Sequence, residues 1–315
     1  MLSVPKRFLL IGHTQDATCE MVAAALERLG HVVILTATPL AAPFSLRWHI
    51  TNGRRGDVNA WSGVDIDSQD IAGVLLRPSG GIVNPDGWNP KDLAYMQTET
   101  QAALIAWACD LKCPVINRPS ADLWFRPQRT YVEWHWQFIQ CKLPVVERLC
   151  VTNDIDEARA YALHWEGRAT YAPLTSPSRY SITEPRHWDE LAKVIAHVPV
   201  CLLPPTIGRS TYVTVVGDEV IWDQNVAFDG SVLEPGLVRL ARVLRLDFIQ
   251  VELATGPSGV NCITADPYPL VERHDSAAQS TIVANLVDRL QGDQPSLQTL
   301  PPEVINLLSH RGFAP

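Results

Sequence analysis

FIQVELATGPSGVNCITADPYP, residues 248–269, reads as two apolar strands separated by a turn that contains glycine and proline. This pattern predicts a β-hairpin. Glu252 lies on the first strand and Asp266 at the end of the second. Because Mg²⁺ is bound by one or two carboxylates together with phosphate oxygens, the two acidic residues predict a site for a metal ion and a triphosphate. Thr264 stands where a second, bridging carboxylate is expected, so the hairpin has the shape of such a site with part of its charge missing.

Length, charge and cysteine content exclude several classes of protein. The chain has 315 residues, enough for two or three domains, and a formal net charge of -8. This acidic balance argues against a nucleic-acid partner, since phosphate binding needs a concentrated basic surface. The seven scattered cysteines predict free thiols in a reducing cytoplasm rather than a disulfide framework. The short apolar run at residues 8–11 predicts a first strand, not a signal peptide or a membrane span.

The first third of the chain alternates strands and helices in the manner of an open α/β sheet. Strands are expected at residues 8–12, 31–37, 71–77 and 114–119, helices at 19–30 and 91–112, and a polar, glycine-containing stretch at 51–68. The residues after Gly12 lack the further glycines of a dinucleotide-binding turn, which argues against that class. Arg77 lies at a strand end, where open α/β sheets bind ligands, so it is either an anion ligand or a partner in a loop salt bridge.

The middle and C-terminal parts have a different pattern, in which helices flank an antiparallel region. Helices are expected at residues 131–141, 154–165, 188–197, 236–246 and 277–290, and a short apolar helix at 302–308. Trp134 and Trp136 cannot both face one way on a helix. One of them is therefore expected on an outward face, either packed against a neighbouring domain or covered by its own loop.

This order of elements resembles the ATP-grasp superfamily, in the branch that contains glutathione synthetases, ribosomal-protein glutamate ligases and microviridin-type ligases. The resemblance covers nearly the whole chain and is carried by PVINRPSADLWFRPQRTYVEWHWQFIQCKLPVVER, by TYVTVVGDEVI and by the hairpin. It implies an α/β fold that becomes α+β in its C-terminal part. It also implies three domains: a pre-ATP-grasp α/β domain at residues 1–118, a central lid subdomain at 119–200 and a C-terminal subdomain at 201–315.

The same resemblance implies a nucleotide site whose charged residues are largely replaced. The two lysines that bind phosphates in the family correspond to Gln128, beside Arg129, and to Ala172. The glycine-rich loop corresponds to residues 175–179, where Pro177 removes a backbone donor. Residues 203–205 occupy the hinge beside the adenine, and Tyr212 stands in place of an arginine. Of the metal trio, Glu252 replaces Asp, Thr264 replaces Glu and Asp266 replaces Asn. The arginines that partly restore positive charge in this scheme are Arg129, Arg179 and Arg209.

Two classes of function stay open on these residues. In the first, the chain is a non-catalytic binding or partner subunit of a biosynthetic pathway that needs no cofactor. In the second, it is a divergent ligase that uses Mg-ATP to join a carboxylate to an amine through an acyl phosphate. A third reading takes His274 and Asp275 as an acid–base pair, with helix capping or a surface position as the alternative.

The expected ligand is a small molecule or a peptide carboxylate, bound at the domain junction by Arg77, Arg209, Tyr212 and Arg273. Arginine forms bidentate hydrogen bonds with carboxylates, which favours such a site, and inter-domain salt bridging is the alternative. A scaffold without its own chemistry acts through what it holds. The sequence therefore predicts a homo-oligomer or a catalytic partner protein, with no nucleic acid and no membrane as partners.

Overall fold

The computed structural model divides the chain into two compact units. It describes residues 4–12, 15–37, 44–51, 54–61, 63–77, 89–120, 123, 129–174, 178–205, 207–256 and 259–292. Unit 1 combines Met1–Trp124, Arg245–Phe248 and Leu270–Pro315, and unit 2 combines Phe125–Leu244 and Ile249–Pro269. This division differs from three consecutive segments with boundaries after residues 118 and 200. The C-terminal helix α8 (Ser276–Gln291) belongs to the first unit, and the strand β11 (Val200–Leu203) pairs with strands of the middle segment.

Unit 1 contains a parallel four-stranded sheet of order β2-β1-β6-β7. Its strands are β1 (Arg7–Gly12), β2 (Val32–Ala37), β6 (Ile71–Leu76) and β7 (Val115–Ile116). Its helices are α1 (Ala17–Arg28), α2 (Pro90–Asp110) and α8 (Ser276–Gln291), with short 3-10 turns η1 (Ser68–Asp70) and η4 (Val271–Arg273). The four apolar residues of β1 that follow Arg7 are fully buried, as expected for a strand covered on both faces.

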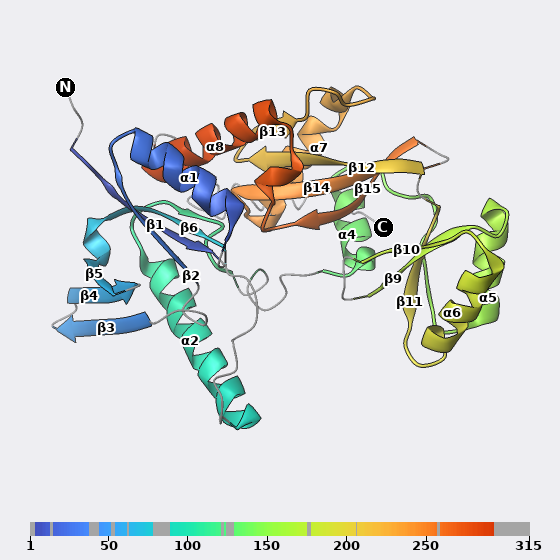
Figure 1. Cartoon of the computed structure of the whole chain (residues 1–315), viewed down its shortest axis with the longest axis horizontal. Coiled ribbons are helices and arrows are strands. Elements are labelled where there is room, and N and C mark those ends of the chain that lie inside the picture. Colours follow the sequence, from blue (N-terminus) through green and yellow to red (C-terminus); the bar gives the residue numbers. More distant parts are fainter. Residues whose placement is uncertain are drawn as a thin grey trace, which may run out of the picture. The chain divides into compact units, whose positions relative to one another are not determined.

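Helix α8 packs closely on this sheet and runs beside α1 (Figure 1). Gly73 of β6 permits the approach, because a Cβ atom built there would lie 2.4 Å from the carbonyl oxygen of Leu290. Glycine is therefore required at this position by close contact with a helix backbone rather than by a turn. The packing explains why a helix near the C-terminus belongs to the N-terminal unit.

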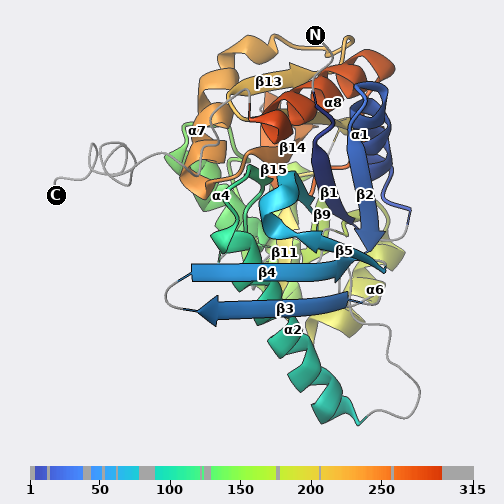
Figure 2. The same ribbon diagram turned by 90° about the vertical axis from the view of Figure 1, so that its left-hand side faces the viewer.

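A second sheet of unit 1 lies where the sequence predicted only a polar stretch. Strands β3 (Phe44–Thr51), β4 (Arg54–Trp61) and β5 (Val64–Asp67) form an antiparallel sheet (Figure 2). Trp61 is fully buried, and its ring lies 5.3 Å from that of Trp107 on α2. The strands within the polar stretch at 51–68 were not predicted, because they are anchored by a few large residues such as Trp61 and Ile66, which a polar average conceals.

Unit 2 contains two further sheets, one of order β10-β9-β11-β8 and one of order β13-β12-β14-β15. The first consists of β8 (Cys150–Thr152), β9 (Ala169–Pro173), β10 (Tyr180–Ile182) and β11 (Val200–Leu203), packed against α5 (Ile155–Ala162) and α6 (Pro185–Ile195). The second consists of β12 (Ile207–Val216), β13 (Glu219–Trp222), β14 (Phe248–Gly256) and β15 (Gly259–Asp266), accompanied by α4 (Tyr131–Gln140) and α7 (Glu234–Leu244). Two short 3-10 turns are η2 (Leu163–Trp165) and η3 (Gly230–Val232). Among the helices described, none has the length and apolar character needed to cross a bilayer.

The two tryptophans of α4 face opposite ways, as predicted. Trp134 is 3% exposed and stacks on Phe138 at 5.9 Å between ring centres, whereas Trp136 is 56% exposed. The helix begins with a capping box, in which Thr130 and Glu133 satisfy each other's backbone N–H groups. The cap sets where the helix begins, and the face that carries Tyr131, Trp134 and Phe138 is the buried one.

Substitution of the two tryptophans should therefore have very different effects on stability. We expect Trp134→Ala to lower the free energy of unfolding by about 3–5 kcal/mol, because it leaves a large cavity in the core. Trp136→Ala should change it by less than about 0.5 kcal/mol, as is usual for exposed positions. Urea unfolding followed by circular dichroism measures both. Equal losses for the two variants would contradict the orientation of α4.

Candidate functional site

The hairpin predicted at residues 248–269 is present as strands β14 and β15. Its register places Glu252 opposite Thr264 and Gln250 opposite Asp266. Because side chains alternate between the two faces of a strand, these four residues lie on one face of the hairpin. Glu252 and Asp266 are diagonal neighbours there, a relation that corresponds to about 7–8 Å and lies within reach of long side chains. Both acidic residues therefore share one face of the sheet.

Glu252 forms an ion pair with Arg179, which directly precedes β10. Its Oε1 atom accepts hydrogen bonds from Arg179 Nη2 and from the Ser210 hydroxyl. Arg179 Nη2 also donates to Ser210 Oγ at 3.2 Å. The side chains of Arg179 and Glu252 are 20% and 10% exposed, so solvent screens the pair only in part. The charge of Glu252 is compensated by a residue of the chain itself.

One nitrogen of Arg179 is left over in this arrangement. Nη1 is buried and has no hydrogen-bond partner among the residues that the structure describes. Tyr131, at the start of α4, is buried and lies near enough to Arg179 and Glu252 to interact with both charges. Burial raises the pKa of Tyr131 to about 12, while the charge of Arg179 acts to lower that pKa and the charge of Glu252 to raise it. The phenol is therefore protonated at neutral pH. A neutral hydroxyl thus lies near a guanidinium whose Nη1 has no hydrogen-bond partner among the described residues.

Position 172, one of the two that correspond to phosphate-binding lysines, lies in an apolar interior. Ala172 of β9 pairs with Cys201 of β11 and is fully buried. Around it, side chains of both sheets, of α4 and of the segment between α4 and β8 pack into one cluster: Tyr131, Val146, Ala172, Cys201, Leu203, Ala254 and Ile263. Burial raises the pKa of the Cys201 thiol to about 12, which reflects how completely this layer is removed from water. Around Ala172, the layer between the two sheets of unit 2 is thus filled by apolar side chains.

The residues present do not fit a magnesium–nucleotide site. Mg²⁺ requires hard oxygen ligands in near-octahedral geometry, usually including a carboxylate. Glu252 is paired with Arg179, Thr264 supplies only a hydroxyl, and Asp266 accepts a hydrogen bond from the backbone N–H of Tyr268 at 2.8 Å. Within the described ranges, no group of three or more His, Cys, Asp or Glu residues is arranged to bind a metal ion.

The other candidate residues of unit 2 have separate surroundings. Arg129 lies over the ring of Trp134, with 5.6 Å between its guanidinium carbon and the ring centre, a cation–π contact. Tyr212 is half-buried on β12. Gln128 and the side chain of Arg209 lie outside the described residues, as does the proline of the loop at 175–177. Ser210 was not predicted from the sequence, because a single serine on a strand carries no pattern.

The candidate residues of unit 1 have structural contacts. Arg77 is 4% exposed, and its Nε donates to Asp16 Oδ2 at 2.8 Å, so its contacts fit the salt-bridge alternative. Arg273 is exposed on η4. Asp275 caps α8 by accepting hydrogen bonds from the backbone N–H groups of residues 277 and 278, which supports capping over an acid–base pair with His274. The described contacts thus give Arg77 and Asp275 structural roles.

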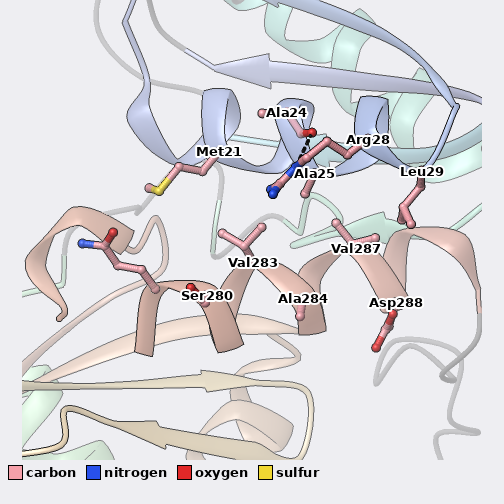
Figure 3. Close-up of a pocket in the computed structure, with 11 residues that line it drawn as sticks. Met21, Ala24, Ala25, Arg28, Leu29, Ser280, Val283, Ala284, Val287 and Asp288 are labelled. Carbon is pink, nitrogen blue, oxygen red and sulfur yellow. Dashed lines mark hydrogen bonds between the residues drawn. The ribbon is translucent and has the colours of Figure 1, made fainter. Parts of the chain in front are cut away.

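Unit 1 also contains a cavity of about 610 Å³ between α1 and α8 (Figure 3). It is lined by Met21, Ala24, Ala25, Arg28, Leu29, Gln279, Ser280, Val283, Ala284, Val287 and Asp288. Arg28 donates from Nε to the carbonyl of Ala24 at 3.1 Å, within its own helix. None of the candidate site residues lines this cavity, and its lining is mainly small and apolar.

No protein-family model matches the sequence, and no curated protein matches it either. Solved structures do match the fold. A RiPP-associated ATP-grasp ligase from Chryseobacterium gregarium, in complex with ADP and a leader and core peptide, superposes with a TM-score of 0.68 at 16% identity, over 93% of this chain and 98% of the other.

Two further structures give the same result. The macrocyclase MdnC from Microcystis aeruginosa MRC, bound with the precursor peptide MdnA, matches with a TM-score of 0.70 at 13% identity, over 91% and 100% of the two chains. A RimK domain protein from Sphaerobacter thermophilus DSM 20745 matches with a TM-score of 0.56 at 16% identity, over 90% and 98%. The chain therefore has the ATP-grasp fold, as its sequence predicted.

Proposed function

We propose that this chain is an ATP-grasp-fold protein that binds a peptide without ATP turnover and acts as a binding or partner subunit in the biosynthesis of a peptide product. The observation that carries the proposal is the ion pair between Arg179 and Glu252, on the hairpin where the fold would bind its metal ion. The complexes of the Chryseobacterium ligase and of MdnC with their peptides support a peptide as the ligand.

The electrostatics of the site support the absence of turnover. Formation of an acyl phosphate from ATP requires cations that stabilise the charge on the transferred phosphoryl group. At the two lysine positions this chain has Gln128 and the fully buried Ala172. The carboxylate of Glu252 is already neutralised by Arg179, so it attracts a divalent cation weakly. The missing lysines and the neutralised carboxylate all weaken the binding of Mg-ATP, so their effects add to one another.

A divergent ligase is the second candidate, and one observation favours it. Glu252 and Asp266 lie on the same face of the hairpin, as two acidic metal ligands would. Such an enzyme would join a carboxylate to an amine through an acyl phosphate. For that chemistry Arg179 must leave Glu252 and a metal ion must bind in its place.

Titration with Mg-ATP separates the two functions. At 1 mM Mg-ATP we expect a stabilisation of no more than about 0.4 kcal/mol, the value for a ligand at its dissociation constant. We also expect no release of ADP when a carboxylate, N-acetyl-glutamate amide, is added together with hydroxylamine, which traps an acyl phosphate formed from that carboxylate. Calorimetry and a coupled ADP assay are the measurements. A saturable stabilisation together with trapped acyl phosphate would establish the ligase instead.

The peptide is tested by purification of the tagged chain from its native host, followed by mass spectrometry of what it retains. One peptide species at constant stoichiometry is expected after gel filtration. Light scattering of the same sample reports whether the chain is a homo-oligomer or is joined by a second protein. Recovery of a bare monomer would count against both the peptide and the partner.

A further inference from the structure

A guanidinium lies on Glu252, on the hairpin face where the ATP-grasp fold would bind a divalent cation. Arg179 Nη2 donates to Glu252 Oε1, and Ser210 bonds to both groups. Arginine is always protonated in proteins, so the guanidinium keeps its positive charge at every pH at which the protein is folded. A metal ion approaching Glu252 would meet a positive charge within hydrogen-bonding distance of its ligand oxygen.

The same guanidinium has capacity for a second partner. Nη1 is buried and has no partner among the described residues, although the great majority of buried donors are hydrogen-bonded. A metal ion in such a site would bridge the protein carboxylate to an anionic oxygen of the ligand. The planar guanidinium has the donors for the same bridge, with Nη2 on Glu252 and Nη1 toward the ligand.

We propose that Arg179 takes the place of the metal ion on this hairpin and binds an oxyanion of the ligand directly, so that anion binding here requires no divalent cation. The inference rests on the proposed function, since it names the group of the peptide that unit 2 would recognise: a carboxylate. A phosphate has the same oxyanion chemistry. The experiment therefore includes both.

The surroundings of the guanidinium favour a compact anion. Tyr131 adds a buried, protonated hydroxyl close to the pair, and the cluster around Ala172 closes the neighbouring layer with apolar side chains. Low local dielectric strengthens a charge-assisted hydrogen bond and also raises the cost of an unpaired charge. An anion that enters must therefore satisfy Nη1 without leaving charges of its own unpaired.

The test measures anion and metal binding separately, in the full-length protein. The anion probes are N-acetyl-glutamate amide, inorganic phosphate and ADP, each titrated by calorimetry with EDTA and again with 5 mM Mg²⁺. The metal probe is Mn²⁺, followed by electron paramagnetic resonance. For the wild-type chain we expect at least one anion to bind, with an affinity that differs by less than twofold between the EDTA and Mg²⁺ series.

Three variants test the role of Arg179 by changing anion binding and Mn²⁺ binding in opposite or unchanged directions. Arg179→Met should weaken anion binding at least tenfold and allow Mn²⁺ to bind at Glu252. Glu252→Gln should strengthen anion binding severalfold, because it removes the charge that competes for the guanidinium. Arg168→Met changes an exposed arginine of unit 2, which pairs with Glu166 at the surface, and should leave both readouts unchanged. If Arg179→Met fails to fold, Glu252→Gln alone still tests the direction of the effect.

Several outcomes would overturn the inference. These are anion binding that disappears in EDTA, anion binding that Arg179→Met leaves intact or Glu252→Gln weakens, and the lack of binding of any probe up to 10 mM. The assay of ADP release stands apart from these outcomes. Trapped acyl phosphate would refute the proposed function, whereas failure of every anion probe without ADP release would refute only the role of Arg179.

Discussion

Replacement of Ala172 by lysine should destabilise the protein far more than replacement by methionine. The two side chains have similar length, and both overfill a position that is fully buried among apolar neighbours. Only lysine adds a charge, and an uncompensated buried charge costs about 3–5 kcal/mol. We expect a difference of that size between Ala172→Lys and Ala172→Met at pH 6, measured by urea unfolding.

The pH dependence of this difference has a defined sign. Burial lowers the pKa of a lysine in the folded state below its unfolded value of about 10.4. The destabilisation is therefore complete at pH values below the folded pKa and shrinks as the pH rises toward 10, where both states hold the neutral amine. Ala172→Lys should also gain no ATP turnover.

Equal stability of the lysine and methionine variants at pH 6 and at pH 10 would contradict the burial of position 172. It would mean that the ammonium group reaches water, and hence that position 172 opens onto a solvent-filled cleft. The charge missing from the sequence could then be restored by one substitution. That result would weaken the case against ATP binding and favour the divergent ligase.

Loss of the carboxylate of Asp247 should have an effect of similar size in unit 1. Arg289 of α8 donates from Nη2 to Asp247 Oδ1 at 3.0 Å, and the two side chains are only 6% and 2% exposed. Asp247→Ala leaves a buried cation without this partner, for which we expect a loss of about 3–5 kcal/mol. The melting temperature and urea unfolding of the variant measure it.

Two controls distinguish the cost of the unpaired buried charge from the cost of removing any aspartate side chain. Asp218 pairs with Arg242 at 2.9 Å on the surface of unit 2, where both side chains are about half exposed, so Asp218→Ala should cost less than about 1 kcal/mol. The double variant Asp247→Leu with Arg289→Met should recover much of the loss, since it removes both charges together. A single-variant loss no larger than that of Asp218→Ala would contradict the burial of the pair.

Local pattern sufficed where each segment carries its own physical signal. The apolar run of β1, the glycine and proline between β14 and β15, and the opposed tryptophans of α4 all follow from periodicity and turn chemistry. The antiparallel sheet at β3–β5 escaped prediction because its burial depends on Trp61 meeting Trp107 of a helix far along the chain. Single large residues in a polar stretch leave no periodic signal.

The candidate site shows the same division. The sequence identified Glu252, Thr264 and Asp266 and the absence of lysine at positions 128 and 172. It offered Arg179 only as one of three arginines, and nothing in it linked that residue to Glu252, since 73 residues separate the two. Side-chain geometry alone shows that Ser210 takes part and that Nη1 of Arg179 has no hydrogen-bond partner among the described residues.

The sequence by itself determined an open α/β part followed by an antiparallel part, and its resemblance to the ATP-grasp superfamily predicted the fold, because the order of strands, turns and amphipathic helices is a property of consecutive residues. Tertiary structure decided where the charges are compensated and which segments form each unit. Asn117 is an example, since its amide exchanges two hydrogen bonds with the backbone of Phe248, 131 residues away, and so fixes the start of β14. Such contacts depend on distances in space between residues remote in sequence, and only the packed chain brings them together.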